Sequence, residues 1–212
     1  MDPEGCRLLI TIEGIDGSGK SSLVEGLKGL LSDLSPLFTR EPGATWVGDQ
    51  VRRAIAERVD PVTEALLFAA DHAAHLATLV APAIREGRIV ISDRYTDSRY
   101  AYQSVMLDGV LSEPLAWLRA VHAGWTIPPD CTFLLVLPVE KAMERLSANR
   151  TREHFEEGEV LSRVQQQYLV LAGEEPGRFV VIDALGEKEE ICRFVAGEIR
   201  SLSGSRRPRH RS

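Results

Sequence analysis

The stretch GIDGSGKS at residues 14–21 follows an apolar run at residues 8–13 and precedes a segment with helical periodicity. Its spacing is that of a phosphate-binding loop, in which glycines let backbone N–H groups surround an oxyanion at the start of a helix. Lys20 is expected to contact the β- and γ-phosphates of ATP or GTP, and the Ser21 hydroxyl to bind Mg²⁺. The alternative is a glycine-rich turn without a ligand. The predicted ATP-binding residues are Gly14, Ile15, Asp16, Gly17, Ser18, Gly19, Lys20, Ser21 and Ser22.

Outside this loop, five short apolar runs have the length and composition of strands that are buried on both faces. They lie at residues 8–13, 37–40, 88–93, 131–137 and 179–183. Helical stretches separate them, at residues 20–31, 48–58, 61–86, 98–106, 114–123, 140–148, 156–172 and 187–202. The alternation predicts an α/β fold, in which a five-stranded parallel sheet has helices on both faces. Ligands bind beyond the carboxyl ends of the strands in such sheets.

The composition predicts an ordinary globular protein, because 44% of the 212 residues are hydrophobic and 26% are charged. Residues 1–204 are expected to form one domain with a short lid at about 148–158, followed by a basic tail at residues 205–212. We see no apolar run of about 18 residues and no signal peptide at residues 1–7, so we expect a cytoplasmic protein. Three scattered cysteines without a C-x-x-C pair exclude a disulfide framework and a cysteine zinc site.

The charge distribution argues against a general nucleic-acid binder. The formal net charge is −6, although four arginines lie within the last seven residues, so the body of the chain is acidic. Affinity for nucleic acid depends on many cationic contacts to phosphates, which an acidic body does not supply. The tail is interpreted as a solvated terminus, and the alternative is a weak nucleic-acid or acidic-surface arm.

Three further segments carry residues that suit an acceptor site. They are TREPGAT at residues 39–45, LLFAADH at residues 66–72 with His75 beyond it, and SDRY at residues 92–95 followed by Ser98, Ala101, Tyr102 and Gln103. Taken in order with EGIDGSGK at residues 13–20, they resemble the thymidylate kinases over residues 8–183. The resemblance implies a three-layer P-loop kinase fold that phosphorylates dTMP to dTDP. It also implies ATP and Mg²⁺ as cofactors and a homodimer with no nucleic-acid or membrane partner.

The catalytic phosphate contacts are assigned to the end of the third expected strand. Arg94 can form a bidentate clamp on the acceptor phosphate, while Asp93 can hold the Mg²⁺ shell or orient the clamp. A surface ion pair is the alternative. Arg52 is a second candidate phosphate contact, and a solvent-facing arginine is the alternative there.

The remaining acceptor residues are assigned by the resemblance. Phe68 is expected to stack on the base, although an aromatic residue on a long helix also suits a core. Asp16 is expected at the 3′-hydroxyl, and Tyr102 is expected to exclude a 2′-hydroxyl. The resemblance also implies a cis peptide between Glu41 and Pro42. The predicted substrate-binding residues are Asp16, Glu41, Pro42, Arg52, Phe68, His72, Arg94, Arg99, Tyr102 and Gln103.

Several positions depart from the family pattern, and two of them lie among the predicted substrate-binding residues. His72 stands where the helix that reads the base usually has arginine, and Arg99 stands where a small polar residue is common. Because His72 lies four residues after Phe68, it shares that helical face. We hypothesise that His72 donates a hydrogen bond to a thymine carbonyl, assisted by Arg99. The alternative is a histidine that faces solvent or bonds within its own helix.

The lid is expected to supply a catalytic arginine. In families of this kind the arginine sits in the phosphate-binding loop or in the lid, and here Gly17 occupies the loop position after Asp16. Arg150 and Arg152 are therefore the candidates, with Arg145 on the preceding helix as a third.

Two other functions are compatible with the phosphate-binding loop. One is a related kinase that acts on another nucleotide or on a nucleoside. The other is a regulatory P-loop ATPase that binds a protein partner. The second leaves Phe68 and the segment at residues 92–95 without a role.

Overall fold

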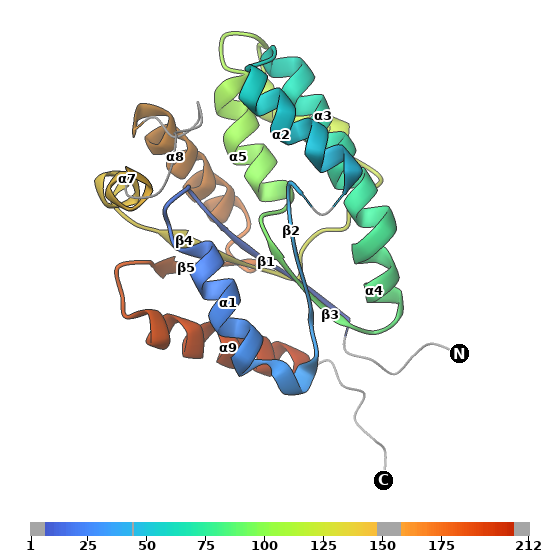
Figure 1. Ribbon diagram of the computed structural model, residues 1–212, viewed down its shortest axis with the longest axis vertical. Coiled ribbons are helices and arrows are strands. Elements are labelled where there is room, and N and C mark those ends of the chain that lie inside the picture. Colours follow the sequence, from blue (N-terminus) through green and yellow to red (C-terminus); the bar gives the residue numbers. More distant parts are fainter. Residues whose placement is uncertain (1–6, 44, 148–157, 206–212) are drawn as a thin grey trace.

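The sheet has five parallel strands, as the sequence predicts, and the structure shows that their order is β2-β3-β1-β4-β5 (Figure 1). The computed structural model describes residues 7–43, 45–147 and 158–205. The strands are β1 (Leu8–Gly14), β2 (Leu37–Arg40), β3 (Ile89–Asp93), β4 (Cys131–Val136) and β5 (Phe179–Asp183). Strand β1 is central and pairs with β3 and β4, which come much later in the chain. The expected lid lies outside the described residues except for Gly158, and so does the tail beyond Ser205.

Helices cover both faces of the sheet, which gives the predicted three-layer α/β architecture of a P-loop kinase. The α-helices are α1 (Lys20–Leu30), α2 (Trp46–Glu57), α3 (Pro61–His75), α4 (Ala81–Arg85), α5 (Thr96–Met106), α6 (Pro114–His122), α7 (Val139–Ser147), α8 (Gly158–Glu174) and α9 (Lys188–Ser205). Two shorter helical segments are the 3₁₀ turn η1 (Ser32–Leu34) and the π segment η2 (Leu76–Val80). Helices α1 and α9 lie side by side on one face, while α5 and α8 lie on the other (Figure 1).

The two outer strands differ from the expectation that every strand is buried on both faces. All residues of β1 are buried, whereas β2 is partly exposed and Val181 on β5 is 52% exposed. Strands β2 and β5 are the edges of the sheet, and each has only one neighbouring strand. The apolar run therefore identified each strand without revealing its position in the sheet.

The helix expected over residues 61–86 is interrupted by the π segment η2. Pro82 lies just beyond this segment, and proline has no N–H to donate to the carbonyl four residues earlier, at Thr78. Its ring would also clash with that carbonyl in a regular α-helix. The π segment thus lies where the regular hydrogen-bond ladder of the α-helix is interrupted.

The segment Pro61–Arg85 is long and apolar enough by composition to cross a membrane. Its inner face nevertheless carries Asp71, His72 and His75, which are fully buried. All three have side-chain partners within the protein. It therefore packs in this structure with one face against the protein, while residues such as Leu66 on its other face are exposed.

Candidate active site

The lysine of the phosphate-binding loop is enclosed by the loop itself. Lys20 is buried, and its Nζ donates to the carbonyl oxygens of Gly14 at 3.0 Å and Ile15 at 2.9 Å. Burial and the nearby charge of Arg94 lower the pKa of Lys20 to about 8. The loop connects β1 to α1, so the ammonium group lies at the carboxyl end of the central strand.

Gly17 has no room for a side chain, because helix α7 packs directly on the loop. A Cβ atom at Gly17 would lie 2.4 Å from the carbonyl oxygen of Ala142, and the residue has a φ of +80°. Both the contact and the backbone conformation favour glycine. This gives a physical reason why the loop carries no arginine here. Arg150 and Arg152, the two lid candidates, lie outside the described residues.

A cavity of about 390 Å³ opens beside the phosphate-binding loop. Gly19 and Ser22 from the predicted ATP-binding set line it, together with Arg145 on α7 and Ala184 just after β5. Arg145 donates from Nη1 to the Gly17 carbonyl and from Nη2 to the Ala184 carbonyl, each at 3.3 Å. This arginine therefore joins the loop to the segment that follows β5.

Arg94, Asp16 and Tyr102 come together at the mouth of the loop, as the sequence predicts for residues of one site. Arg94 Nη2 pairs with Asp16 Oδ1 at 2.5 Å, and the Tyr102 hydroxyl donates to Asp16 Oδ2 at 2.9 Å. The Arg94 guanidinium also lies over the Tyr102 ring, 4.8 Å from its centre. Although burial opposes it, the charges of Arg94 and Lys20 lower the pKa of Asp16 to about 2. Asp16 is therefore the anion that Arg94 holds in this structure.

Asp93 and Ser21 also meet. The Ser21 hydroxyl donates to Asp93 Oδ2 at 3.2 Å. Asp93 Oδ1 is buried and has no hydrogen-bond partner among the residues that the structure describes. A hydroxyl and a carboxylate at the edge of a phosphate-binding loop are oxygen ligands of the kind that Mg²⁺ prefers.

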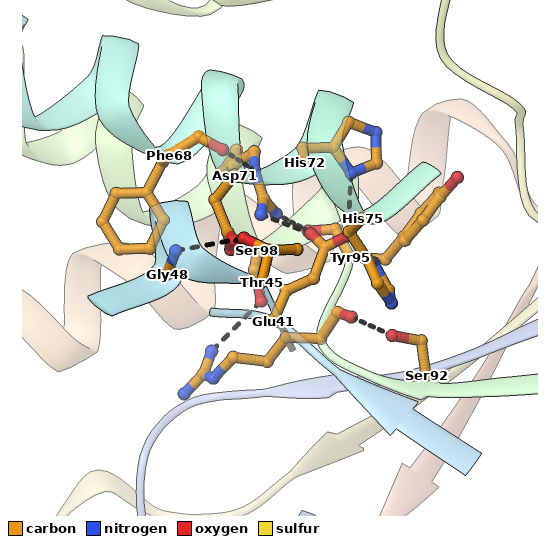
Figure 2. Close-up of polar contacts among 12 residues, drawn as sticks. Glu41, Thr45, Gly48, Phe68, Asp71, His72, His75, Ser92, Tyr95 and Ser98 are labelled. Atoms are coloured by element: carbon orange, nitrogen blue, oxygen red, sulfur yellow. Dashed lines mark hydrogen bonds and ion pairs between the residues drawn. The ribbon is translucent and has the colours of Figure 1, made fainter. Parts of the chain in front are cut away.

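Glu41 lies buried between the end of β2 and helix α3 (Figure 2). Its Oε1 accepts from Nδ1 of His72 at 2.9 Å and from Nδ1 of His75, while its Oε2 forms an ion pair with Arg99. Although burial opposes it, Arg99 and His72 hold the pKa of Glu41 well below its usual value. The Glu41–Pro42 peptide is cis, as expected. Glu41, predicted to bind substrate, thus connects β2, α3 and α5.

His72 has different partners from those that the sequence predicts. Its side chain is fully buried, and its Nε2 lies 2.6 Å from the Thr126 hydroxyl while Nδ1 faces Glu41. Burial lowers the pKa of His72, so the neutral ring donates from Nδ1 to the carboxylate and accepts at Nε2. Both nitrogens are therefore engaged within the protein, and neither is free to donate to a base. Sequence spacing placed His72 near Phe68 but gave no sign of Glu41 or Thr126.

Arg99 and Phe68 are in direct contact. The Arg99 side chain is 2% exposed, and it donates from Nε to the Phe68 carbonyl at 3.2 Å and from Nη1 to the Tyr95 carbonyl at 2.6 Å. Its guanidinium carbon lies 5.7 Å from the centre of the Phe68 ring. Together with Glu41, these contacts fix the guanidinium beside an aromatic face.

Gln103 and Arg52, which were also predicted to bind substrate, lie on different helices. Gln103 is buried on α5, one residue beyond Tyr102. Arg52 is exposed on α2 and pairs with Asp49. A Cβ atom at Gly43 would lie 2.5 Å from Arg52 Nη1, so this guanidinium rests against the turn after Pro42. Arg52 thus faces solvent and borders the turn after Pro42 at the same time.

Glu13 is a residue of this site to which the sequence assigned no role. It lies fully buried on β1, and it accepts hydrogen bonds from the Tyr95 N–H, the Ser98 hydroxyl and the Tyr168 hydroxyl. Burial and the negative charge of Asp97 raise the pKa of Glu13 to about 7. The signal was present in the sequence, because Glu13 is a carboxylic acid at the end of an otherwise apolar strand.

Comparison with known proteins agrees with this geometry. Residues 12–195 match the family model described as thymidylate kinase. A protein of Methanoculleus marisnigri named probable thymidylate kinase is 66% identical over 204 residues, which cover 95% of this chain and 100% of the relative. Proteins of the same name from Methanospirillum hungatei and Methanocorpusculum labreanum are 56% and 55% identical, over 90% and 92% of this chain and 92% and 98% of their own lengths. With the phosphate-binding loop and the sequence comparisons in agreement, the chain belongs to the thymidylate kinase family of nucleoside monophosphate kinases.

Proposed function

We propose that this thymidylate kinase transfers the γ-phosphoryl group of ATP to dTMP in the space between Lys20 and Arg94. The observation that carries the proposal is that both cations approach one atom. Lys20 Nζ lies 3.0 Å and Arg94 Nη1 lies 3.5 Å from the Gly14 carbonyl oxygen. A cation suited to the donor phosphates and a guanidinium suited to the acceptor phosphate therefore meet at the end of β1.

The acceptor phosphate is already an anion near neutral pH, so the transfer needs no strong general base. An acceptor oxygen attacks the γ-phosphorus in line with the leaving ADP oxygen. The protein contributes positioning and charge neutralisation through Lys20 and Arg94. We assign the further cation that acts in the closed complex to Arg150 or Arg152 of the lid, because Gly17 leaves no space for one in the loop.

We propose that Mg²⁺ is held by Ser21 and Asp93. The buried Asp93 Oδ1 and the adjacent Ser21 hydroxyl support this assignment. Among the described residues, no group of three or more His, Cys, Asp or Glu side chains is gathered as a metal site. Few protein ligands are typical of Mg²⁺ that also binds nucleotide phosphates. The bound ion would neutralise charge on the β- and γ-phosphates.

The nucleoside of ATP is assigned to the cavity beside the loop. Its volume suits a purine nucleoside, since ligand pockets are typically about 300 to 1,000 Å³. Arg145 lies at its edge with fixed backbone partners, so its planar guanidinium can stack on a base.

We assign recognition of the thymine base to Phe68 and Arg99. Phe68 offers a ring face for stacking. The described partners of Arg99 are two carbonyls and the Glu41 carboxylate, and a guanidinium has five N–H groups, so it retains donors for a base carbonyl. His72 then supports Arg99 through their shared partner Glu41 instead of touching the base.

The deoxyribose is assigned to Tyr102 and Asp16. Their direct contact supports a shared sugar site, in which the Tyr102 ring excludes a 2′-hydroxyl and Asp16 accepts from the 3′-hydroxyl. Comparison of dTMP with its ribose counterpart tests this assignment. The preference for dTMP should fall at least about tenfold in Tyr102→Ala, and an unchanged preference would contradict the exclusion of the 2′-hydroxyl.

A substrate panel tests the proposed function as a whole. The purified chain is offered nucleoside monophosphates and nucleosides with ATP or GTP and Mg²⁺, and ADP or GDP formation is measured by a coupled assay. We expect dTMP to give the highest kcat/KM. A higher value for another nucleotide or a nucleoside would favour a related kinase, and hydrolysis that is independent of any acceptor would favour a regulatory ATPase.

We also propose a cytoplasmic homodimer that binds neither nucleic acid nor membranes. The acidic composition supports the absence of nucleic acid, and the exposed Leu66 on α3 offers apolar surface for a second copy. Light scattering after size exclusion measures the mass in solution. A mass near 23.4 kDa would contradict the dimer.

A further inference from the structure

Glu13 is buried on the central strand β1. It contacts residues that in turn contact Arg94, the arginine proposed to bind the acceptor phosphate. Its Oε1 accepts from the Tyr95 N–H at 2.7 Å. Its Oε2 accepts from the Ser98 hydroxyl at 2.6 Å and from the Tyr168 hydroxyl at 2.8 Å. None of the contacts assigned above to phosphate, base, sugar or Mg²⁺ uses this carboxyl group.

These bonds hold Arg94 at both its backbone and its side chain. Arg94 has a φ of 68°, a left-handed conformation that is costly for a residue with a side chain. Glu13 fixes the next peptide N–H, that of Tyr95, while the Ser98 hydroxyl oxygen accepts from Arg94 Nη1 at 3.1 Å. Glu13 therefore fixes the backbone after Arg94 and the hydroxyl that orients its guanidinium.

The oxygens around Glu13 can accommodate one more proton. Glu13 Oε2, Ser98 Oγ and Tyr168 Oη form a triangle, because Ser98 and Tyr168 are also only 2.8 Å apart. When Glu13 is ionised, the two hydroxyls supply only two protons for three short contacts. A proton on Oε2 lets every side of the triangle carry a hydrogen bond, and Ser98 still keeps a lone pair for Arg94.

The surrounding charges make the protonation of Glu13 depend on the positive charge of Arg94 and on any anion bound to it. Asp97 on α5 disfavours an ionised Glu13, although Arg178 partly neutralises Asp97 through a bidentate ion pair. Arg94 favours the ionised form. Lys20 on α1 adds a second positive charge. An anion bound to Arg94 offsets the positive field that keeps Glu13 ionised.

We propose that Glu13 is the positioning residue of Arg94 and that it takes up a proton when the acceptor phosphate binds. The proposal rests on the proposed role of Arg94 as the acceptor clamp. The proton comes from solvent and binds to Glu13 Oε2, and no covalent bond to a heavy atom forms or breaks. By linkage, raising the pH weakens acceptor binding through this group, because the proton must be supplied at a lower concentration.

Calorimetry of dTMP binding in two buffers of different ionisation enthalpy counts the protons taken up. The titration uses the full chain with EDTA and without ATP, so that no metal ion contributes. At about pH 7.5, we expect wild type to take up about 0.3 to 0.5 proton more per dTMP than Glu13→Gln. The phosphate of dTMP, whose second pKa is about 6, titrates in both titrations and cancels in the difference. Equal proton numbers for two folded proteins would overturn the proposal.

Two tyrosine variants keep the test decisive if Glu13→Gln does not fold. Tyr168→Phe removes one hydrogen bond to the ionised carboxylate, so Glu13 is already more protonated before dTMP binds, and uptake should fall below the wild-type value. Tyr100→Phe, on the same helix as Ser98, removes a hydroxyl that does not contact Glu13 and should keep the wild-type number. Wild-type uptake in a folded Tyr168→Phe would contradict the proposal. An absence of dTMP binding to wild type would contradict the proposed function itself.

Discussion

Arg94 shows how much of the structure is used to hold one side chain. Its left-handed backbone is fixed on three sides: its N–H donates to the Ile12 carbonyl, its carbonyl accepts from Ser92, and the next N–H bonds to Glu13. Such a conformation persists only where the surroundings determine it. In return, a guanidinium is presented at a fixed place beside the phosphate-binding loop, which lowers the entropy lost when a phosphate binds.

Replacement of this arginine should therefore impair transfer more than it impairs folding. We expect Arg94→Ala, like Lys20→Ala, to lower kcat/KM for dTMP phosphorylation by about a hundredfold or more, because each removes a charge-assisted contact to a reacting phosphate. Steady-state kinetics over a range of dTMP concentrations measures the effect. Arg119→Ala, which breaks an exposed ion pair with Glu174, is the matched control and should leave kcat/KM close to wild type. Near-normal turnover by a folded Arg94→Ala would rule out the clamp.

His122 makes stability depend on pH. Its side chain is 1% exposed, its Nδ1 donates to the Leu118 carbonyl, and burial lowers its pKa to about 4. In the unfolded chain this histidine has its ordinary pKa near 6.5, so it binds a proton at pH values at which the folded protein keeps it neutral. Stability should therefore fall as the pH falls from about 6.5 to 4, by on the order of 2 kcal/mol from this residue.

Urea denaturation at several pH values checks this expectation. His122→Phe keeps an aromatic ring stacked on Trp125 but cannot be protonated, so its stability should fall less steeply over the same range. The comparison uses the slope and not the absolute stability. Parallel curves for the two proteins would mean that His122 is not the group that titrates.

For single residues, the sequence predicted several side chains that the structure brings together. It did not predict all of their contacts. Arg94, Asp16 and Tyr102 follow from their motifs, because each motif lies at the carboxyl end of a parallel strand or on the helix that follows it. His72 was placed correctly on the face of Phe68. Its actual partners, Glu41 and Thr126, are distant in sequence, and only tertiary packing brings them to the ring.

Among the secondary-structure elements, helix α7 has an effect beyond its own packing. It lies so close to the phosphate-binding loop that the loop must be built with glycine at residue 17. The sequence predicted the helix and the glycine separately. Their contact could not be predicted, because it depends on the direction in which the chain leaves β4.

Gly17→Ala should therefore disrupt the loop. We expect at least about a tenfold loss of kcat/KM for ATP, because the added Cβ displaces either α7 or the loop backbone by more than side chains can absorb. Gly29→Ala on α1 is the matched control, since among the described residues no atom outside its own helix backbone and chain neighbours lies within 4 Å of its Cβ position, and alanine favours a helix. Kinetics and thermal melting of both variants make the test. Full activity of Gly17→Ala would show that the contact between α7 and the loop is not close in solution.

For the molecule as a whole, the donor cavity connects parts of the chain that are remote in sequence. The loop after β1, helix α7 and the segment after β5 all contribute to its wall, and Arg145 bridges them. The parallel sheet makes this possible, because every strand ends at the same edge. For the same reason the sequence could predict that the site lies at this edge and that loop residues such as Gly19 and Ser22 belong to it, whereas it gave no sign of the segment after β5 in the cavity wall.

Arg145→Ala should weaken the binding of ATP much more than the binding of dTMP. We expect KM for ATP to rise about tenfold while the affinity for dTMP stays within about twofold, because the arginine lines the cavity that we assign to ATP. Isothermal titration with each nucleotide alone distinguishes the two effects. Lys188→Ala, on the same cavity wall, removes a flexible cation instead of a planar guanidinium and is a control that should change ATP affinity little. A loss of dTMP affinity equal to the loss for ATP would mean that Arg145 supports the whole site.

The central position of β1 also has a consequence for the nascent chain during its synthesis on the ribosome. Thr11 on β1 and its neighbour Thr132 on β4 are 121 residues apart in sequence. At translation rates of about 5 to 20 residues per second, the first strand waits roughly 6 to 24 s before that neighbour has been synthesised. Strand β3 is synthesised earlier and can pair with one edge of β1, but the other edge stays unpaired throughout this interval. An unpaired edge of an apolar strand is a natural target for chaperones. The strand that is buried along its whole length in the folded protein is thus the one whose second edge stays unpaired longest in the nascent chain.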